Sequence, residues 1–379
     1  MNTLKPKSMH KQAFLFAMLV ASLFFLPFII IDSGFFLFYG DFNVQQVPFY
    51  RLCHEAVRSM EIFWNNKTDL GVNFIGSYSF YNLGSPFFWL TLPFPSAAVP
   101  YLMGPLLILK CSFASLFAYM YLSRFVKNKQ YAVIGALLYA FSGFSIYNIF
   151  FNHFHEAIVY FPLLLLSLEL FMAENRRGVF GVMVFLTAVS NYFFFVSMAV
   201  FLFIYWLLRM LSGAWSITPQ RFGALAFETA IGFAMAMFIL LPSIIVANSS
   251  PRTGGYITGW NAFIYYNKQI FYNIFQVFFF PPDLPARPVF WPEADVKWSS
   301  LGAWLPLFGM TGFFAFSYSK RGHWLRRLIC ILFFMAAVPV LNSAFILFNN
   351  AFYTRWFFML TLMIALATDW KSTRLNSSH

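Results

Sequence analysis

An aspartate, Asp41, follows the first long apolar stretch of the chain, within the sequence YGDFN. A carboxylate at this place could accept a proton from an attacking hydroxyl group, or it could bind a divalent cation such as Mg²⁺ or Mn²⁺. It could also cap the helix that follows, because aspartate is a favoured residue at helix N-termini. The local sequence leaves these three roles open.

Histidines and further carboxylates occur at two other places. His54 and Glu55 are adjacent, and the sequence NHFHE contains His153, His155 and Glu156. The composition of NHFHE resembles a metal site, but alternate positions share one face only in an extended segment, and no HExxH pattern supports zinc. Hydrogen bonding to a substrate, assistance as a general base and simple interfacial polarity are the other interpretations of these residues.

Two arginines and one asparagine complete the polar candidates. Arg252 lies in PRTGGY, where the glycines let backbone N–H groups approach an anion. Arg355 lies in an apolar stretch, where a cation is costly without a partner. That partner could be a phosphate or the Asp41 carboxylate, or the side chain could reach the lipid headgroups instead. Asn191 is the most polar point of the long apolar stretch 179–211 and is a further candidate for substrate binding.

The elements that must position these side chains are membrane helices. Of 379 residues, 60% are hydrophobic and only 10% are charged, whereas soluble domains carry about 25% charged residues. The bilayer must therefore solvate most of the chain. The net charge of +12 comes from basic residues scattered between apolar segments, so nucleic acid is not an expected partner. These features predict an all-α polytopic membrane protein.

Apolar stretches of sufficient length predict about ten transmembrane helices. The expected spans are 13–32, 100–123, 131–150, 157–173, 179–190 joined to 192–211, 222–247, 300–317, 325–341 and 346–367. The stretch 179–211 is too long for one crossing, so we divide it at Asn191. The intervening segments 33–99 and 248–299 are rich in aromatic residues, proline and glycine, and both are predicted to be structured. Residues 43–59 are expected to form an amphipathic helix on the membrane surface.

The basic residues of the short loops predict the orientation. If the N-terminus is cytoplasmic, every short cytoplasmic loop is basic, as the positive-inside rule requires. The residues concerned are Lys5, Lys7, Lys11, Arg124, Lys127, Lys129, Arg176, Arg177, Arg209, Arg221, Lys320, Arg321, Arg326 and Arg327. The two long segments and NHFHE then lie outside the cytoplasm, together with most of the carboxylates.

Four motifs resemble the YfhO-type family of bacterial membrane proteins. They are GDFNVQQVPFY from Gly40, NFIGSY from Asn73, GSP from Gly84 and YTRW from Tyr353. The resemblance covers nearly the whole chain and implies a GT-C-like glycosyltransferase fold over residues 1–370, in a bacterial cell membrane. Such enzymes take a sugar from a polyprenyl-phosphate carrier at the outer leaflet. They pass it to an extracytoplasmic acceptor, for this family a cell-wall teichoic acid or another glycopolymer.

The resemblance also implies site roles. In GT-C enzymes an acidic residue of the first outer loop acts as a base or holds a metal, and Asp41 matches that position. Arg252 and Arg355 are the candidates for holding the carrier phosphate. A transporter or flippase of lipid-linked or polar solutes is the alternative function, and a non-catalytic scaffold is a third. A transporter should line a path near the midplane with charged residues, whereas these candidates gather at one face.

The last nine residues, 371–379, read KSTRLNSSH and resemble the translation of a sequencing adapter. We therefore expect a non-native tail on a chain truncated near Asp369. Such a chain would lack the further helices and the outer domain that the resemblance implies.

Overall fold

The computed structural model describes residues 6–68, 70–249, 257–283, 290–294, 296, 298–307, 309–349 and 352–375. These residues are mostly helical, so the predicted all-α class is confirmed. The helices are α1 Pro6–Ile31, α2 Val47–Arg58, α3 Phe74–Tyr78, α4 Pro86–Trp89, α5 Val99–Leu122, α6 Lys129–Ala140, α7 Gly143–Tyr147, α8 His155–Glu174, α9 Val179–Ser190, α10 Tyr192–Leu211, α11 Pro219–Asn248, α12 Lys268–Gln276, α13 Gly309–Ser319, α14 Trp324–Ala337, α15 Pro339–Ser343 and α16 Phe357–Leu375. Two short antiparallel strands, β1 Trp64–Asn65 and β2 Val72–Asn73, pair in the first long segment.

Six helical stretches of the described chain are long and apolar enough to cross a membrane. They are Ser8–Ile31, Ser96–Leu122, Lys129–Phe150, Asn152–Glu174, Tyr192–Leu211 and Pro219–Asn248. Trp324–Ala337 and Pro339–Ile346 would make a seventh if they form one span, although they are bent by 105°. The multi-pass architecture is thus confirmed, whereas the predicted number of about ten crossings is not.

The difference arises mainly in the C-terminal third, where backbone breaks shorten the predicted helices. Val338 precedes Pro339 and takes an extended conformation, which ends α14. Leu307 has a φ of 65°, and α13 begins only two residues later. Leu347 has a φ of 55°, and α16 does not begin until Phe357. Hydropathy alone did not register these breaks, because the residues around them are apolar.

Two local predictions are confirmed. The stretch 179–211 divides at Asn191, which has an extended backbone, and its side chain accepts a hydrogen bond from the Phe194 amide to cap α10. The amphipathic helix of the first long segment is α2, preceded by a π-helical turn over Phe42–Gln46. In α2, Tyr50 is buried while Arg51 is exposed.

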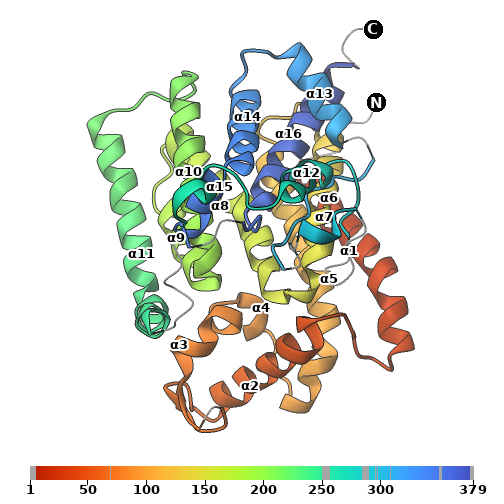
Figure 1. Ribbon diagram of the computed structural model, residues 1–379, viewed down its shortest axis with the longest axis vertical. Helices are drawn as coiled ribbons and strands as arrows, with labels where there is room; N and C mark the ends of the chain where they lie inside the picture. The colour runs from red at the N-terminus through yellow and green to blue at the C-terminus, as the bar shows by residue number, and fades with distance from the viewer. Residues whose placement is uncertain are drawn as a thin grey trace.

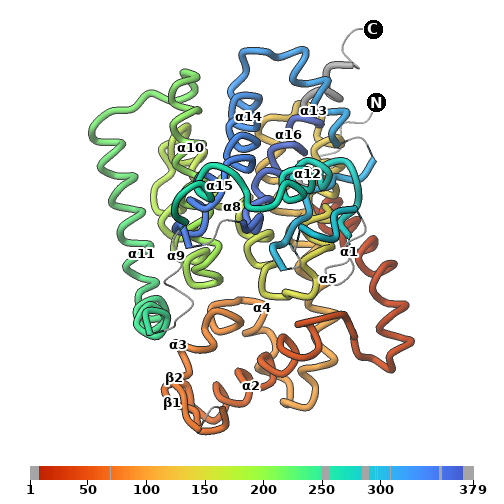
Figure 2. The backbone as a smooth tube through the Cα atoms, viewed as in Figure 1, coloured from red at the N-terminus to blue at the C-terminus, as the bar shows by residue number. Residues whose placement is uncertain are grey.

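The helices form a bundle, and the short helices α2, α3 and α4 cover one end of it, which we call the polar end. In Figure 1, α2, α3 and α4 lie together at the lower end, and both termini lie at the opposite end. Figure 2 shows β1 and β2 at the edge of the same lower layer. Helices α1 and α11 stand on opposite sides of the bundle, where only 22% and 28% of their apolar windows are buried, against 83% for the span that contains α8. The outer helices therefore face lipid, and α8 lies in the core.

The basic loops gather at the end of the bundle that carries the termini. The Arg124 guanidinium lies 2.7 Å from Glu174 Oε1, which joins the end of α5 to the end of α8. The Arg209 guanidinium, on α10, lies 4.8 Å from the centre of the Trp324 ring at the start of α14. The clustering agrees with the predicted charge pattern. Which face is cytoplasmic remains a prediction.

At the polar end, the two long segments meet. The ring of Trp298 lies 6.4 Å from that of Tyr39 in a stacked arrangement. The amide of Thr354 donates to the Ser299 carbonyl at 2.9 Å. The end of the second long segment therefore lies between the first segment and the loop that leads into α16.

The orientation can be tested with single cysteines in a variant whose exposed Cys330 is replaced by serine; Cys53 and Cys111 are buried and should stay unlabelled. We expect Lys67→Cys to react with a membrane-impermeant maleimide in intact cells, because Lys67 lies in the first long segment. Ala214→Cys, in the loop between α10 and α11, should react only after the membrane is opened. The reverse labelling pattern would overturn the predicted orientation.

Candidate functional site

The fold places Arg355 within electrostatic range of Asp41, close to where the two long segments meet. Gly40, with a φ of 66°, turns the chain just before Asp41. The Asp41 side chain makes no capping hydrogen bond to the helical turn that follows, so the geometry does not support the capping role. Burial raises the pKa of the Asp41 carboxyl, and the Arg355 guanidinium partly offsets this by lowering it. The net result is a carboxylate with a pKa above its ordinary value.

Arg355 is enclosed by aromatic rings. Its guanidinium carbon lies 4.4 Å from the ring centre of Tyr353, 5.0 Å from Phe154 and 5.2 Å from Phe193. Burial lowers the pKa of Arg355, whereas Tyr353 and Asp41 are among the groups that raise it. Arg355 Nε is buried and has no hydrogen-bond partner among the described residues. Ring faces stabilise a cation without using its N–H donors, so this donor remains available to an anion.

His153 adjoins the same site. Its Nδ1 lies 2.8 Å from Gln46 Oε1, in the turn that follows Asp41. Its backbone carbonyl accepts a hydrogen bond from Asn191 Nδ2 at 3.2 Å. His153 Nε2 is buried without a hydrogen-bond partner in the described part of the chain. Asn191 thus caps α10 and also binds the backbone of His153. One ring nitrogen of His153 is free to bind a ligand.

Glu156 has a partner that the sequence analysis did not identify. Its Oε1 lies 2.9 Å from Lys110 Nζ, and both side chains are at most 1% exposed. Ser85 Oγ also donates to Glu156 Oε1, and Lys110 Nζ donates to the Asn152 carbonyl at 3.0 Å. A buried charge in an apolar span is costly without a partner. The sequence could therefore have suggested that the lysine of one span pairs with the glutamate at the end of another.

The remaining candidates are dispersed. His54 is buried, and its two ring nitrogens already lie 3.0 Å from Ser96 Oγ and 3.2 Å from the Thr91 carbonyl. Glu55 is partly exposed and pairs with Arg51 at 3.0 Å.

His155 points its Nε2 to the Ser145 carbonyl at 3.0 Å. Arg252 lies outside the described residues. The structure therefore brings together Asp41, Arg355 and His153, and it does not bring His54 or Glu55 to them.

Several buried polar atoms around this site have no hydrogen-bond partner. Within the described chain, they include His153 Nε2, Glu156 Oε2 and Arg355 Nε. Buried polar groups are normally hydrogen-bonded, so a cluster of unpaired ones indicates a place that water or a polar ligand fills. The described residues contain no group of three or more His, Cys, Asp or Glu side chains that could hold a metal.

A family model described as bacterial membrane protein YfhO matches residues 13–376. The chain belongs to the YfhO family. No protein of curated function matches it closely enough to count as a relative. Membership establishes a bacterial membrane protein and confirms the resemblance on which the sequence analysis relied.

Other charges within this YfhO-family bundle are already paired. Glu169 accepts hydrogen bonds from Arg209 Nε at 2.9 Å and Nη2 at 3.1 Å. Glu228 accepts from the amides of Gly178 and Gly181 at 2.7 and 3.1 Å. These carboxylates join α8 to α10 and α11 to the start of α9. Both carboxylates therefore hold helices together at the basic end of the bundle.

The Lys110–Glu156 pair predicts a strong stability effect. Lys110→Met should lower the free energy of unfolding by about 3–5 kcal/mol, because Glu156 would stay buried without its cation. The double variant Lys110→Met/Glu156→Gln should recover most of this loss. Thermal unfolding of the purified protein would measure both.

The matched control is Lys67→Ala, which removes an exposed ion pair with Glu61 at 4.0 Å and should cost no more than about 1 kcal/mol. If Lys110→Met behaved like this control, the pair would not be a stabilising link.

Proposed function

We propose that this YfhO-family protein is a GT-C type glycosyltransferase. It would move a sugar from a polyprenyl-phosphate carrier to an extracytoplasmic acceptor, such as a teichoic acid or another cell-wall glycopolymer. The observation that supports the proposal is the electrostatic influence of Arg355 on Asp41, two residues from opposite ends of the sequence. Together they supply a base and a cation beside a cluster of unpaired polar atoms.

The reaction needs both groups. The acceptor hydroxyl oxygen attacks the anomeric carbon of the sugar and forms a new C–O bond. The bond from that carbon to the phosphate oxygen breaks, and polyprenyl phosphate leaves with its electron pair. Asp41 accepts the proton of the hydroxyl, and Arg355 stabilises the negative charge that develops on the leaving phosphate.

The surroundings of Asp41 suit a base. A carboxylate with an ordinary pKa is a weak base near neutral pH, and raising the pKa strengthens it. Burial has this effect on Asp41, while Arg355 keeps the carboxylate ionised. The two opposing influences favour a group that is deprotonated at rest but able to take a proton during transfer.

Other side chains would bind the substrates. His153 Nε2, buried and without a hydrogen-bond partner among the described residues, is suited to a hydrogen bond with a sugar hydroxyl. Arg252 remains a second candidate for the carrier phosphate. His155, Glu156 and Asn191 hold their neighbours in place, so we assign them to support of the site. His54 and Glu55 bond to groups away from the site, so we assign them no substrate contact.

A transporter or flippase remains the alternative, because Lys110 and Glu156 are ionisable residues within helical spans, and such residues often line transport paths. Their direct pairing at 2.9 Å without exposure favours a structural role. Transfer of radiolabelled sugar to acceptor polymer, compared with movement of labelled carrier across proteoliposomes, would separate the two functions.

Replacement of Asp41 tests the proposed base. Asp41→Asn should lower sugar transfer by roughly 10²–10⁴-fold, because the amide cannot accept the proton. Membrane insertion and carrier binding should be unchanged. The control is Glu61→Gln, which alters an exposed carboxylate of the same segment and should leave transfer intact. Full activity of Asp41→Asn would remove Asp41 from the mechanism.

The Arg355 contact predicts a pH effect. Asp41 must be deprotonated to act, so kcat/KM should fall as the pH drops through its pKa. Because Arg355 lowers that pKa, Arg355→Gln should move the acidic limb of the pH profile to higher pH. Arg355→Lys keeps the charge and should move it less. An acidic limb that is identical in all three proteins would refute the coupling.

A further inference from the structure

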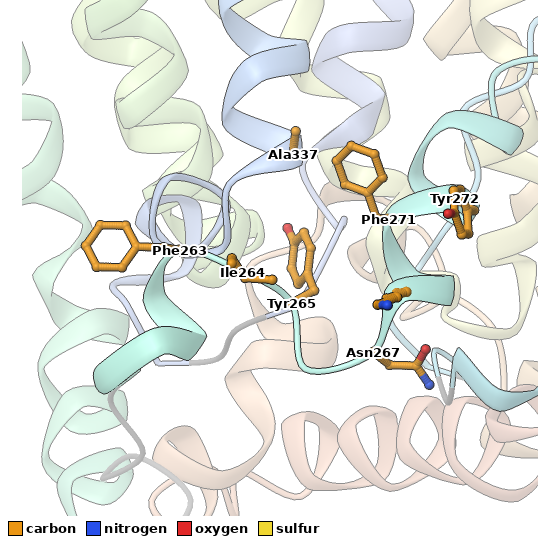
Figure 3. A pocket seen from close by; sticks show the side chains of 8 residues that line it. Phe263, Ile264, Tyr265, Asn267, Phe271, Tyr272 and Ala337 are labelled. Atoms are coloured by element: carbon orange, nitrogen blue, oxygen red, sulfur yellow. The ribbon is translucent and has the colours of Figure 1, made fainter.

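A cleft of about 250 Å³ lies beside α12 in the second long segment. Figure 3 shows it between residues 263–265 and α12, beneath Ala337 at the end of α14. Its lining is mainly aromatic and aliphatic and includes Ile264, Tyr265 and Phe271. An apolar cavity of about 150 Å³ can already hold a molecule of benzene, so this cleft has room for a larger hydrocarbon fragment.

The cleft has a fixed floor and an exposed rim. Tyr265 is only 6% exposed, and its hydroxyl donates to the Ala336 carbonyl at 2.7 Å. Phe263 and Ile264 at the rim are each 64% exposed. An apolar lining left this open in a structured segment indicates a surface that hydrocarbon covers.

One ring contact links the cleft to the loop that carries Arg355. The Tyr265 ring lies 5.3 Å from the ring of Phe352, edge to face. Phe352 is three residues from Arg355 in the loop that enters α16. A ligand with its phosphate at Arg355 could therefore extend its apolar part past Phe352 into the cleft.

One cation marks the rim. Lys268 is exposed, lines the cleft and makes no ion pair among the described residues. The nearby carboxylate of Glu293 is held by Gln269 Nε2 at 3.0 Å. A lysine can lay its methylene groups along hydrocarbon while its ammonium stays in water near an anionic head. The rim thus complements a lipid that combines an apolar chain with a negative group.

From these features, we propose that the cleft binds the isoprene units next to the phosphate of the carrier lipid. The inference rests on the proposed glycosyltransferase function and adds a place for the lipid chain. A sugar acceptor fits less well, since Phe263, Ile264 and Phe271 offer no hydrogen bonds. An ordinary phospholipid also carries a phosphate, and competition with phosphatidylglycerol distinguishes it from the carrier.

The test is photolabelling of the full chain in lipid nanodiscs. The probe is a polyprenyl phosphate with a diazirine on its second isoprene unit, and mass spectrometry locates the attached residues. We expect attachment within residues 263–272. Excess unlabelled polyprenyl phosphate should remove the label, whereas the same excess of phosphatidylglycerol or of uncharged polyprenol should not.

Variants that fill or open the cleft test whether the label depends on it. Ala337→Trp, which fills the cleft, should lower labelling roughly tenfold, since the chain loses apolar burial comparable to one side chain. Phe271→Ala, which removes one wall, should also lower labelling and covers the case in which the larger residue prevents folding. The control, Phe238→Ala on lipid-facing α11, removes a ring that is 62% exposed and should leave labelling unchanged.

The outcomes separate the two proposals. Sugar transfer with the label attached elsewhere, or with equal displacement by phosphatidylglycerol, would overturn the cleft while leaving the enzyme. Labelling in the cleft without transfer to any acceptor would support the cleft as a prenyl-phosphate site and count against the glycosyltransferase.

Discussion

The buried ion pair between Lys110 and Glu156 is the contact on which the arrangement of the polar end depends. It links α5 to the first turn of α8, and through Asn152 it fixes the short turn that carries His153. Ser85 at the start of α4 joins the same carboxylate. A charge inside a membrane bundle must find its partner before the helices can pack. The pair therefore fixes the start of α8 against the middle of α5, next to the turn that carries His153.

Close backbone contacts supply the rest of the specificity. Helices in lipid gain little from hydrophobic burial and associate through small residues and tight packing. A Cβ added to Gly84 would lie 1.6 Å from the Val189 carbonyl oxygen, and one added to Gly232 would lie 2.4 Å from the Gly181 carbonyl oxygen. The first contact places the first long segment against the end of α9. The second holds lipid-facing α11 against α9.

Much of this architecture could be predicted from sequence, and the failures have physical causes. The break at Asn191 was visible because a polar residue interrupted an apolar run. Asp41 and Arg355 were recognised because both lie in short motifs, and because a charged side chain in an apolar stretch carries a large free-energy cost that is visible from the local sequence. The irregular backbone around Leu307 and Leu347 was not predictable from hydropathy, since its residues are as apolar as those of a helix. The Lys110–Glu156 pair is a long-range contact, and apolar periodicity carries no information about it. The foreign character of residues 371–379 stays a prediction, and the last four of them lie outside the described chain.

The aromatic enclosure of Arg355 has a consequence for the range over which the protein attracts its ligand. A cation packed among rings and only partly exposed is screened less by dissolved ions than an exposed ammonium such as that of Lys268, which is screened within about 10 Å at 0.1 M salt. The two cations would therefore divide their tasks. Lys268 would aid encounter with an anionic lipid in dilute salt, and Arg355 would retain its hold when ionic strength is high. The association rate of the ligand would then depend on the salt concentration more strongly than its dissociation rate.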